Sequence, residues 1–471
     1  MKNWFVVDKE GLAQLQKGKS KTFIVNELVQ NAWDENITLS GIRFKYDIDN
    51  KLLTITVRDD SPEGFKNITH AYTLFADTYK RRDATKRGRF NLGEKQVIAI
   101  CKTATVKTTK GTIVFDDTGR HELPEKTEKG SLITVTLNAT LDEYNELREH
   151  AKKLIVPKDI VYTVDGVEIP YKPPFKTFNA ILDTEVLKGD AMLLSTRKTT
   201  INLITPTDDK SYIYEMGIPI MEIDCPWHID VQQKIPLAVD RQTVQRYFIQ
   251  DVFAEILNNV YNDLTTKQSS EVWVRTAMKD KRITKEATKQ VLQLRFGNKL
   301  LVGNSFDPNA NDEALAHGYN VISGNIMSKE EWNTIRGFDL VQSTSDMFGH
   351  TGIAEAKPVK PTSAQKNFAK FVKRVAKEFL KIDITVKFVS VKGTNTIADY
   401  GNRELRFNVA HSRIYNGFFD KLTPENIDLM VHELGHEDGN HTEHDYHALL
   451  TKLSANLVIK ALNNPEFFEV N

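Results

Sequence analysis

The sequence predicts a multidomain protein of mixed α/β (α+β) architecture, and three observations lead to this prediction. The chain has 471 residues, about three times the length of a usual domain. Apolar residues recur at helical spacing in some segments and alternate with polar residues, as in strands, in others. Charged residues make up 27% and hydrophobic residues 40% of the chain, which is ordinary for a soluble globular protein. We therefore expect several packed modules.

The charge balance and the cysteine count restrict the class of protein. Basic and acidic residues number 63 each, which argues against a polyelectrolyte that binds nucleic acid along its surface, although the basic segment 80–89 (KRRDATKRGR) leaves local nucleic-acid contact open. Two cysteines, Cys101 and Cys225, cannot form a disulfide framework. No segment has the apolar length of a signal peptide or a membrane span. These features predict a cytoplasmic protein without membrane insertion.

The patterns divide the chain into four modules and a linker. Residues 1–150 alternate a helix, short strands and a glycine-containing stretch, and residues 151–275 add further strands and a long helix. Within residues 276–353, NKLLVG and YNVISG flank a helical pattern, which indicates a small βαβ unit. Segment 354–365 (AEAKPVKPTSAQ) has three Ala, two Pro and no apolar periodicity, and is the predicted linker to a C-terminal domain, 366–471.

A polar stripe runs along the first predicted helix, in SKTFIVNELVQNAWDEN, for which Ser20 is the candidate N-cap. Glu27, Asn31 and Asp34 fall at i, i+4 and i+7, so they share one face of the helix. The opposite face is apolar and consists of Ile24, Val25, Leu28, Val29, Ala32 and Trp33. The stripe is either a solvated helix face or the wall of a site.

An aspartate stands at the end of the predicted strand in KLLTITVRDDSPEGF. Strand alternation places the side chain of Asp59 on the core-facing side and that of Asp60 on the other side. The core-facing residues are Leu53, Ile55 and Val57. Gly64 follows in a turn where backbone can approach a ligand. Asp59 is therefore either a turn-capping residue or a hydrogen-bond acceptor at the mouth of a core.

A third motif, KRGRFNLGEKQVIAI, brackets a short basic loop with Gly88 and Gly93 and continues into an apolar helix. Glycines allow backbone N–H groups to converge on phosphate oxygens, and a helix N-terminus adds a favourable dipole. A glycine pair is a weak signal by itself, and its order behind the other two motifs strengthens it.

In this order, ELVQNAWDEN, RDDSPEGF and GRFNLGEKQ resemble the N box, first glycine box and lid glycine box of the GHKL ATPases, such as gyrase B, MutL, heat-shock chaperone ATPases and histidine kinases. The resemblance covers about residues 1–150 and implies a Bergerat-type ATPase sandwich that binds and hydrolyses ATP with Mg²⁺. It implies that Glu27 is the general base and that Asn31 holds the Mg²⁺. A triphosphate needs both a cation and a carboxylate that orients water, and one helix face supplies both.

The resemblance also implies roles outside the helix. Asp59 would recognise the adenine amino group, but Ser61 replaces the family's first glycine and Glu63 is an extra residue before Gly64, so the choice between Asp59 and Asp60 stays open. Further implied positions are Asp34 on the polar face, Gly64 near the ligand, Gly88 and Gly93 in the lid, Lys95 near the phosphates, and Ser131 where the family often has a threonine.

Lys234, in QQKIPLAVDR, resembles the lysine that the transducer domain of gyrase-like and MutL-like proteins sends to the γ-phosphate. Residues 151–275 would then form a transducer-like module, and ATP-dependent homodimerisation is expected by analogy. An ordinary surface lysine explains the position equally well.

Near the other end, LTPENIDLMVHELGHEDGN predicts a helix with Thr423 as N-cap and Gly439 as the residue that ends it. Its apolar stripe consists of Ile427, Met430, Val431 and Leu434. His432 and His436 lie one turn apart, so both imidazoles can bind one metal ion, and Glu433 beside them can activate a metal-bound water.

Five of the twelve histidines lie between residues 432 and 447, and a third ligand is expected among His441, His444 and His447. HELGH followed by NHTEHDYHALL resembles the zincin metallopeptidases, especially the SprT, YgjP and WLM-like group, over residues 366–471. The resemblance implies zinc, a peptide or protein substrate, and His441 as the third ligand. In the preceding segment 397–412, Gly401 and Asn402 fit a hairpin turn, and the strand after it is a candidate edge that pairs with an extended peptide.

Together these motifs predict an ATPase whose nucleotide-driven switch gates a zinc-dependent peptide hydrolase. The alternative is an ATP-driven clamp, chaperone-like or of the DNA-repair type, in which the HExxH domain only binds zinc or a partner.

Overall fold

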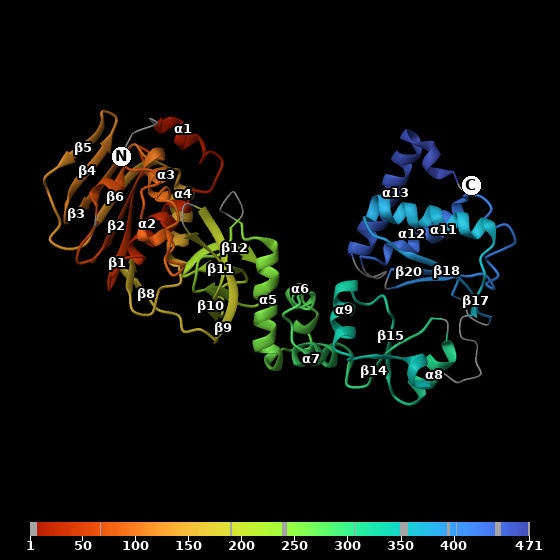
Figure 1. Ribbon diagram of the computed structural model, residues 1–471. Helices are drawn as coiled ribbons and strands as arrows, with labels where there is room; N and C mark the ends of the chain where they lie inside the picture. The colour runs from red at the N-terminus through yellow and green to blue at the C-terminus, as the bar shows by residue number, and fades with distance from the viewer. Residues whose placement is uncertain are drawn as a thin grey trace. The chain divides into compact units, whose positions relative to one another are not determined.

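The computed structural model describes residues 7–65, 67–188, 191–237, 243–305, 307–348, 357–392, 396–401, 403–438 and 444–469. The chain forms two compact units, Met1–Val252 and Phe253–Asn471. Each unit combines helices with β-sheets (Figure 1), so the predicted α+β class is confirmed.

An eight-stranded sheet lies at the centre of the first unit. From edge to edge its strands are β5 (Gly119–Leu123), β4 (Gly111–Asp116), β3 (Thr103–Thr108), β6 (Leu132–Asn138), β2 (Leu52–Asp59), β1 (Leu39–Asp47), β7 (Val161–Val164) and β8 (Val167–Ile169). Neighbours pair antiparallel, except that β7 runs parallel to β1. We expected the last two strands in the second module. They extend the first sheet instead, because the exposed edge of β1 offers them a pairing partner.

Helices cover one face of this sheet. They are α1 (Lys9–Gln14), α2 (Phe23–Trp33), α3 (Gly93–Ile100) and α4 (Leu141–Lys152), with short 3-10 turns at Ile68–Ala71 and Tyr79–Arg81. All six predicted apolar residues of α2 are at most 5% exposed and share one core with Leu53, Ile55 and Val57 of β2, as predicted. The N-cap prediction is wrong, since Thr22 precedes α2 and Ser20 donates its hydroxyl to Glu146 over 2.8 Å.

A second sheet of five strands follows in the same unit. Its order is β12 (Ile218–Ile223), β11 (Ser211–Glu215), β13 (His228–Val231), β10 (Ala191–Ile204) and β9 (Lys176–Lys188), with β11 parallel to β13. Helix α5 (Arg246–Val260) comes next in the chain. The backbone of Ile155, just after α4, donates a hydrogen bond to the carbonyl of Gly217 over 3.0 Å, which joins the two sheets at the turn between β11 and β12.

The second unit begins with helices and a small parallel sheet. The helices are α6 (Val272–Ala277), α7 (Lys285–Phe296), α8 (Pro308–Ala316), α9 (Lys329–Gly337) and α10 (Thr344–Phe348), with 3-10 turns at Tyr261–Asp263 and Gln268–Ser270. Strand β14 (Leu300–Val302) lies between β15 (Asn320–Ile322) and β16 (Gln342–Ser343) and is parallel to both. Since α8 connects β14 to β15, the predicted βαβ unit is confirmed.

A four-stranded sheet follows near the C-terminus, in the order β17 (Lys357–Pro358), β18 (Thr385–Ser390), β20 (Glu404–Asn408) and β19 (Ala398–Gly401). Its helices are α11 (Ser363–Val375), continued by a π-helical turn at Ala376–Leu380, then α12 (Pro424–Gly435) and α13 (His444–Asn463), followed by a 3-10 turn at Pro465–Phe468. They share one apolar core with the sheet.

Two expectations for this region need correction. The segment 354–365 is more than a linker, because Lys357 and Pro358 pair with β18 and Thr362 caps α11 through a capping box. The strand after the hairpin, β20, is not an edge, because β18 and β19 flank it and β19 is the edge strand. The hairpin itself is confirmed by the pairing of Gly401 with Glu404, but Gly401 is the last residue of β19 and not a turn residue. Asn402 lies outside the described residues.

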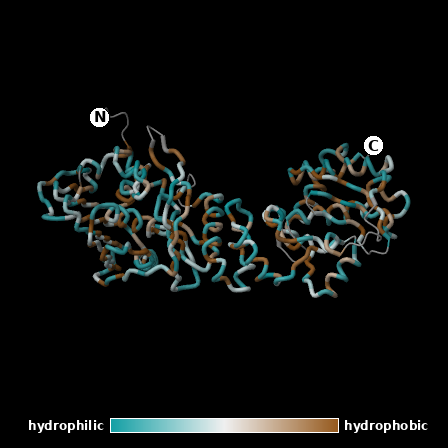
Figure 2. The backbone as a smooth tube through the Cα atoms, turned by 60° about the horizontal axis from the view of Figure 1, so that its bottom comes forward, coloured by the Kyte–Doolittle hydropathy of each residue, from teal (hydrophilic) through white to brown (hydrophobic). Residues whose placement is uncertain are grey.

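Hydrophobic and hydrophilic stretches are interspersed along the chain of both units (Figure 2), as expected for elements with one buried face. Among the helices in the described ranges, none combines the length and the apolar character needed to cross a bilayer.

Histidine 228 should make the first unit sensitive to acid. Its Nδ1 accepts the backbone N–H of Tyr212 over 3.2 Å. Burial, together with the positive charge of Lys172, lowers the pKa of His228 to about 4. The unfolded chain binds this proton below about pH 6.5 and the folded chain does not, so stability falls as the pH falls from 7 to 5, by about 2 kcal/mol from this group. His228→Asn keeps an acceptor near Nδ1 and should reduce the difference in urea unfolding free energy between these pH values. The exposed His121, changed to Asn, is the control, and an equal effect of both variants would contradict the assignment.

Candidate functional site

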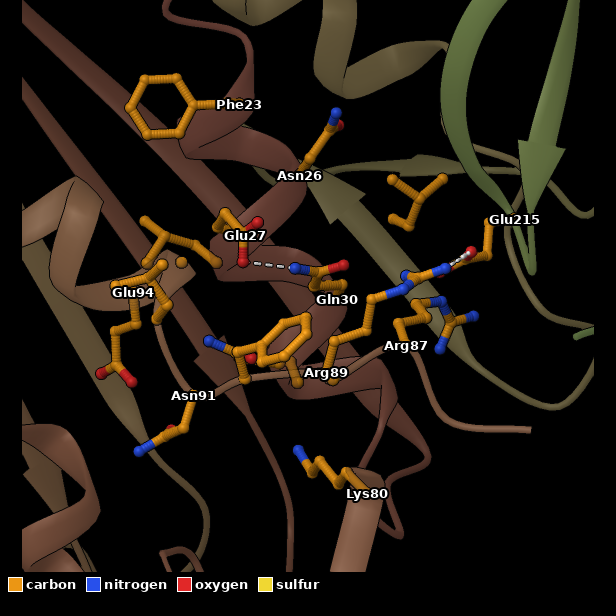
Figure 3. A pocket seen from close by; sticks show the side chains of 18 of the residues that line it. Phe23, Asn26, Glu27, Gln30, Lys80, Arg87, Arg89, Asn91, Glu94 and Glu215 are labelled. Atoms are coloured by element: carbon orange, nitrogen blue, oxygen red, sulfur yellow. Dashed lines mark hydrogen bonds and ion pairs between the residues drawn. The ribbon is translucent and has the colours of Figure 1, made fainter. Parts of the chain in front are cut away.

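A cavity of about 900 Å³ opens in the first unit (Figure 3). Its walls come from α2, the end of β2, the segment before α3, and strands β11 and β12 of the second sheet. The predicted residues that line it are Glu27, Asn31, Asp59, Gly64, Gly88, Gly93 and Ser131. Three motifs that are far apart in the sequence therefore meet at one cavity.

Glu27 lies against the start of α3. A Cβ atom at Gly93, the first residue of α3, would overlap the carboxylate of Glu27. Gln30 donates its amide to the same carboxylate, as the dashed line in Figure 3 shows. A glycine is therefore required at position 93 by the close approach of the acidic side chain, which is placed beside the N-terminal end of a helix, where negative charge is favoured.

The structure distinguishes the two candidate aspartates. Asp59 points to the cavity, and its Oδ1 accepts the backbone N–H groups of Ser61 (2.9 Å) and Ser131 (3.2 Å). Burial raises the pKa of Asp59 above its usual value. Asp60 lies outside the cavity lining and accepts the N–H groups of Thr38 and Leu39 at the start of β1. The strand-alternation prediction for Asp59 is therefore confirmed.

The turn after β2 needs glycine for steric reasons. Gly64 has a φ of 59° and lies close to Thr109, where a Cβ would approach its backbone nitrogen to 3.1 Å. Gly130, just before Ser131, has a φ of 73°, and a Cβ there would overlap the carbonyl oxygen of Asp59. Both positions favour glycine because their backbone is left-handed and crowded.

The third residue of the polar stripe has a different position from the other two. Asp34 caps the C-terminal end of α2, is fully buried, and is not in the cavity lining. Its Oδ1 accepts the N–H of Arg87 over 2.9 Å and the guanidinium of Arg87 over 3.1 Å, and its Oδ2 accepts the N–H of Gly88 over 2.9 Å. Asp34 thus fixes the residues 80–93, which we call the lid segment.

Within the lid segment, Asn91 has a left-handed backbone with a φ of 52°, which asparagine tolerates better than most residues. Its side-chain amide donates to the carbonyls of His70 (3.2 Å) and Thr73 (2.8 Å). Lys95 is buried outside the cavity lining and donates to Asn91 Oδ1 over 3.2 Å. In this structure Lys95 therefore stabilises the lid segment through Asn91, from outside the cavity lining.

Sequence reasoning missed the residues that connect the lid segment to the second sheet. Arg89 forms a two-pronged ion pair with Glu215, the last residue of β11, over 2.7 and 2.5 Å, and both residues line the cavity (Figure 3). Arg87 donates to the carbonyl of Met216, the next residue. The basic character of the loop was visible in the sequence, but nothing there identified Glu215 as its partner.

Lys234 lies in the loop after β13 and its side chain is fully buried. Its ammonium donates to the carbonyls of Lys80 and, over 2.9 Å, of Asp83, both in the lid segment. Burial and the nearby Arg89 lower the pKa of Lys234 to about 8. Lys234 therefore reaches back to the first module, as the resemblance implies, but it contacts the lid backbone and does not line the cavity.

In the second unit, the HExxH motif lies at the end of α12. Thr423 caps this helix as predicted, and Met430, Val431 and Leu434 are buried. The helix ends at Gly435 with His436 as C-cap, earlier than expected, and Gly439 lies outside the described residues.

The two imidazoles of the motif lie next to each other. The ring centroids of His432 and His436 are 5.5 Å apart, close to the separation of about 5 Å that a shared tetrahedral zinc imposes. Tyr446 on α13 packs against His436 at 4.9 Å between ring centroids, and its hydroxyl is 3.1 Å from Nδ1 of His432. Glu433 is 6% exposed, and burial, with Asp399 nearby, raises its pKa to about 8.

Of the three histidines predicted as a third ligand, one has a described side chain. His441 and the side chain of His444 are outside the described residues, while His447 is exposed on α13 beside Tyr446. Among the side chains that are described, no three ligand-type groups come together. The choice among the three histidines stays a prediction.

No protein-family model matches this chain, and no curated protein matches its sequence significantly. Function is therefore inferred from the residues of the chain.

Replacing Asp34 tests how the lid segment is held. Asp34→Ala leaves Arg87, which is 7% exposed, without its acidic partner, and removal of one member of a buried pair is expected to cost about 3–5 kcal/mol. Asp77→Ala breaks the exposed pair with Arg82 and should change the free energy of unfolding by less than about 0.5 kcal/mol. Chemical denaturation of both variants measures the difference. Similar values for the two would show that Asp34 does not anchor the loop.

Proposed function

We propose that the first unit is a GHKL-type ATPase, in which the eight-stranded sheet and its helices form a Bergerat-type sandwich and the second sheet is transducer-like. One observation carries the proposal. Glu27 and Asn31 from α2 line the same cavity as Asp59 and the glycines of the lid segment. A nucleotide needs these three kinds of group at one place: a cation ligand with a base, an acceptor for the base amine, and backbone that approaches phosphate.

The residues present fit Mg²⁺ and a nucleoside triphosphate. Mg²⁺ prefers oxygen ligands, and within the described part of the chain the side-chain amide of Asn31 has no hydrogen-bond partner that would compete for its oxygen. The bound cation would neutralise phosphate charge. Arg87, Arg89 and Lys80 add positive charge to the cavity wall, which suits an anionic ligand.

Each acidic residue has a distinct role in this proposal. Glu27 orients the attacking water and accepts its proton, and its position beside the start of α3 keeps it at the phosphate side of the cavity. Asp59 accepts a hydrogen bond from the exocyclic amine of adenine, and two backbone N–H groups hold its carboxylate in place. Guanine has a carbonyl where adenine has that amine, so Asp59 would select adenine.

Substitution of Glu27 separates binding from hydrolysis. Glu27→Gln should lower kcat for ATP hydrolysis by about 100-fold or more and leave the Kd for ATP similar, because the amide keeps the shape of the side chain but accepts no proton. Phosphate release and calorimetric titration with Mg²⁺–ATP measure the two quantities. Glu63→Gln, at an exposed position of the loop after β2, is the control. A parent protein that binds no adenine nucleotide at millimolar concentration contradicts the proposal.

A second candidate function is favoured by the proximity of the His432 and His436 rings beside the buried Glu433. We propose that the C-terminal domain is a zincin-like peptide hydrolase. His432, His436 and a histidine of the following segment, His441 by resemblance, would hold Zn²⁺, which would lower the pKa of a bound water. Glu433 would take the proton of this water.

The hydrolase proposal is tested by Glu433→Gln. This variant should keep bound zinc, measured by metal analysis, and lose cleavage of an unstructured protein such as casein, because the base is gone and the ligands remain. Glu425→Gln, at an exposed position at the start of the same helix, is the matched control, and loss of zinc from His447→Gln would identify His447 as the third ligand. A parent protein that holds zinc and cleaves nothing supports the alternative of a zinc-binding or partner-binding domain. Cleavage that is indifferent to ATP and to Glu27→Gln excludes nucleotide gating.

A further inference from the structure

The cavity wall contains an arginine, Arg89, whose guanidinium is paired with the carboxylate of Glu215. Arg89 is 10% exposed and donates through Nη1 and Nη2 to the two oxygens of Glu215, with a further bond from Nη2 to the carbonyl of Ile235 over 2.7 Å. Its Nε has no hydrogen-bond acceptor among the described residues and lies 3.7 Å from Oε2 of Glu185, at the distance of a loose ion pair. Arg89 therefore has an unused donor in a buried position that lines the cavity.

Glu215 connects this arginine to the second sheet. It is 3% exposed and ends β11, and its Oε2 also accepts the backbone N–H of Ile235 over 2.7 Å. Ile235 follows Lys234, which is tied to the carbonyls of the lid segment. One carboxylate thus holds the lid segment, β11 and the loop after β13 together.

The other cations of the cavity wall are more fully engaged. Arg87 is held by the buried Asp34 and by the carbonyl of Met216. Lys80 pairs with Glu35 over 2.7 Å. Lys234, the residue that the resemblance assigns to the terminal phosphate, is outside the lining. Arg89 combines a place in the lining with an unused N–H.

Phosphate and carboxylate compete for the same face of a guanidinium. Both accept two parallel N–H bonds from arginine, and the terminal phosphate of ATP carries more charge than a carboxylate. When arginine leaves, Glu215 keeps, among the described residues, only the N–H of Ile235 as a hydrogen-bond donor. A buried carboxylate then loses its ion-pair partner, and its strand is no longer held to the lid segment by this pair.

We propose, on the basis of the ATP-binding function proposed above, that Arg89 exchanges Glu215 for the terminal phosphate of the bound nucleotide. In the nucleotide-free protein the pair fixes the lid segment to β11. In the triphosphate-bound protein the lid segment follows the phosphate and β11 is released, whereas a diphosphate does not reach the arginine and leaves the pair intact. Breaking of the Arg89–Glu215 pair then couples the presence of the third phosphate to the release of β11 in the second sheet.

Weakening the interaction between Glu215 and Arg89 should raise the affinity for a triphosphate and leave the affinity for a diphosphate unchanged. Glu215→Gln keeps the shape and the acceptor for Ile235 but removes the charge that holds Arg89. It should bind a non-hydrolysable ATP analogue about tenfold more tightly than the parent, with the Kd for ADP unchanged. Arg89→Lys should lose most of the preference for the analogue over ADP. Asp208→Asn, in the loop before β11, removes an exposed carboxylate that pairs with Lys153 and lies outside the cavity lining, and should leave the ratio of the two affinities unchanged.

A measurement on the parent protein needs no substitution. Amide hydrogen exchange in Ser211–Glu215 should become faster when the full-length protein binds the analogue with Mg²⁺, and should not change with ADP. Equal exchange with both nucleotides, or equal analogue affinity of Glu215→Gln and the parent, overturns the proposal while nucleotide binding by the parent still supports the ATPase assignment. A parent that binds neither nucleotide overturns both.

Discussion

The cavity depends on the contacts that the buried carboxylate of Asp34 makes with the lid segment. It stands at the end of α2 and accepts hydrogen bonds from the backbone of Arg87 and Gly88 as well as from the Arg87 guanidinium. A fully buried charge is stable only when such partners surround it. The lid segment is therefore fixed to the same helix that carries Glu27 and Asn31, and this attachment makes the glycine loop a wall of the cavity.

Ionic contacts on the other side of the lid segment involve the second sheet. Arg89 pairs with Glu215, and Lys234 donates to two lid carbonyls. These groups are buried, and an arginine, a carboxylate and a lysine cannot be rearranged there without new partners. A ligand that supplies such a partner at the cavity can change the position of the lid segment.

The second unit places the HExxH motif at a helix end. In α12 the first histidine lies within the helix and the second is its C-cap, and Tyr446 from α13 packs against both. Helix periodicity brings the two imidazoles to one side, and the tertiary contact with α13 restricts their orientation. Glu433 is buried beside them, and burial raises its pKa, which makes its carboxylate a stronger base than an exposed one.

The sequence by itself determined the local features of this protein. The apolar spacing of α2, the alternation that turns Asp59 inward and Asp60 outward, the capping of α12 by Thr423 and the βαβ unit follow from periods of 3.6 and 2 residues, which depend only on near neighbours in the chain. The tertiary structure alone decided that β7 and β8 join the first sheet, that Asp34 and Lys95 support the lid segment outside the cavity, and that Glu215 is the partner of Arg89. The reason is physical: a buried charge takes whichever opposite charge the packing of distant elements brings within reach, and Arg89 and Glu215 are 126 residues apart in the chain.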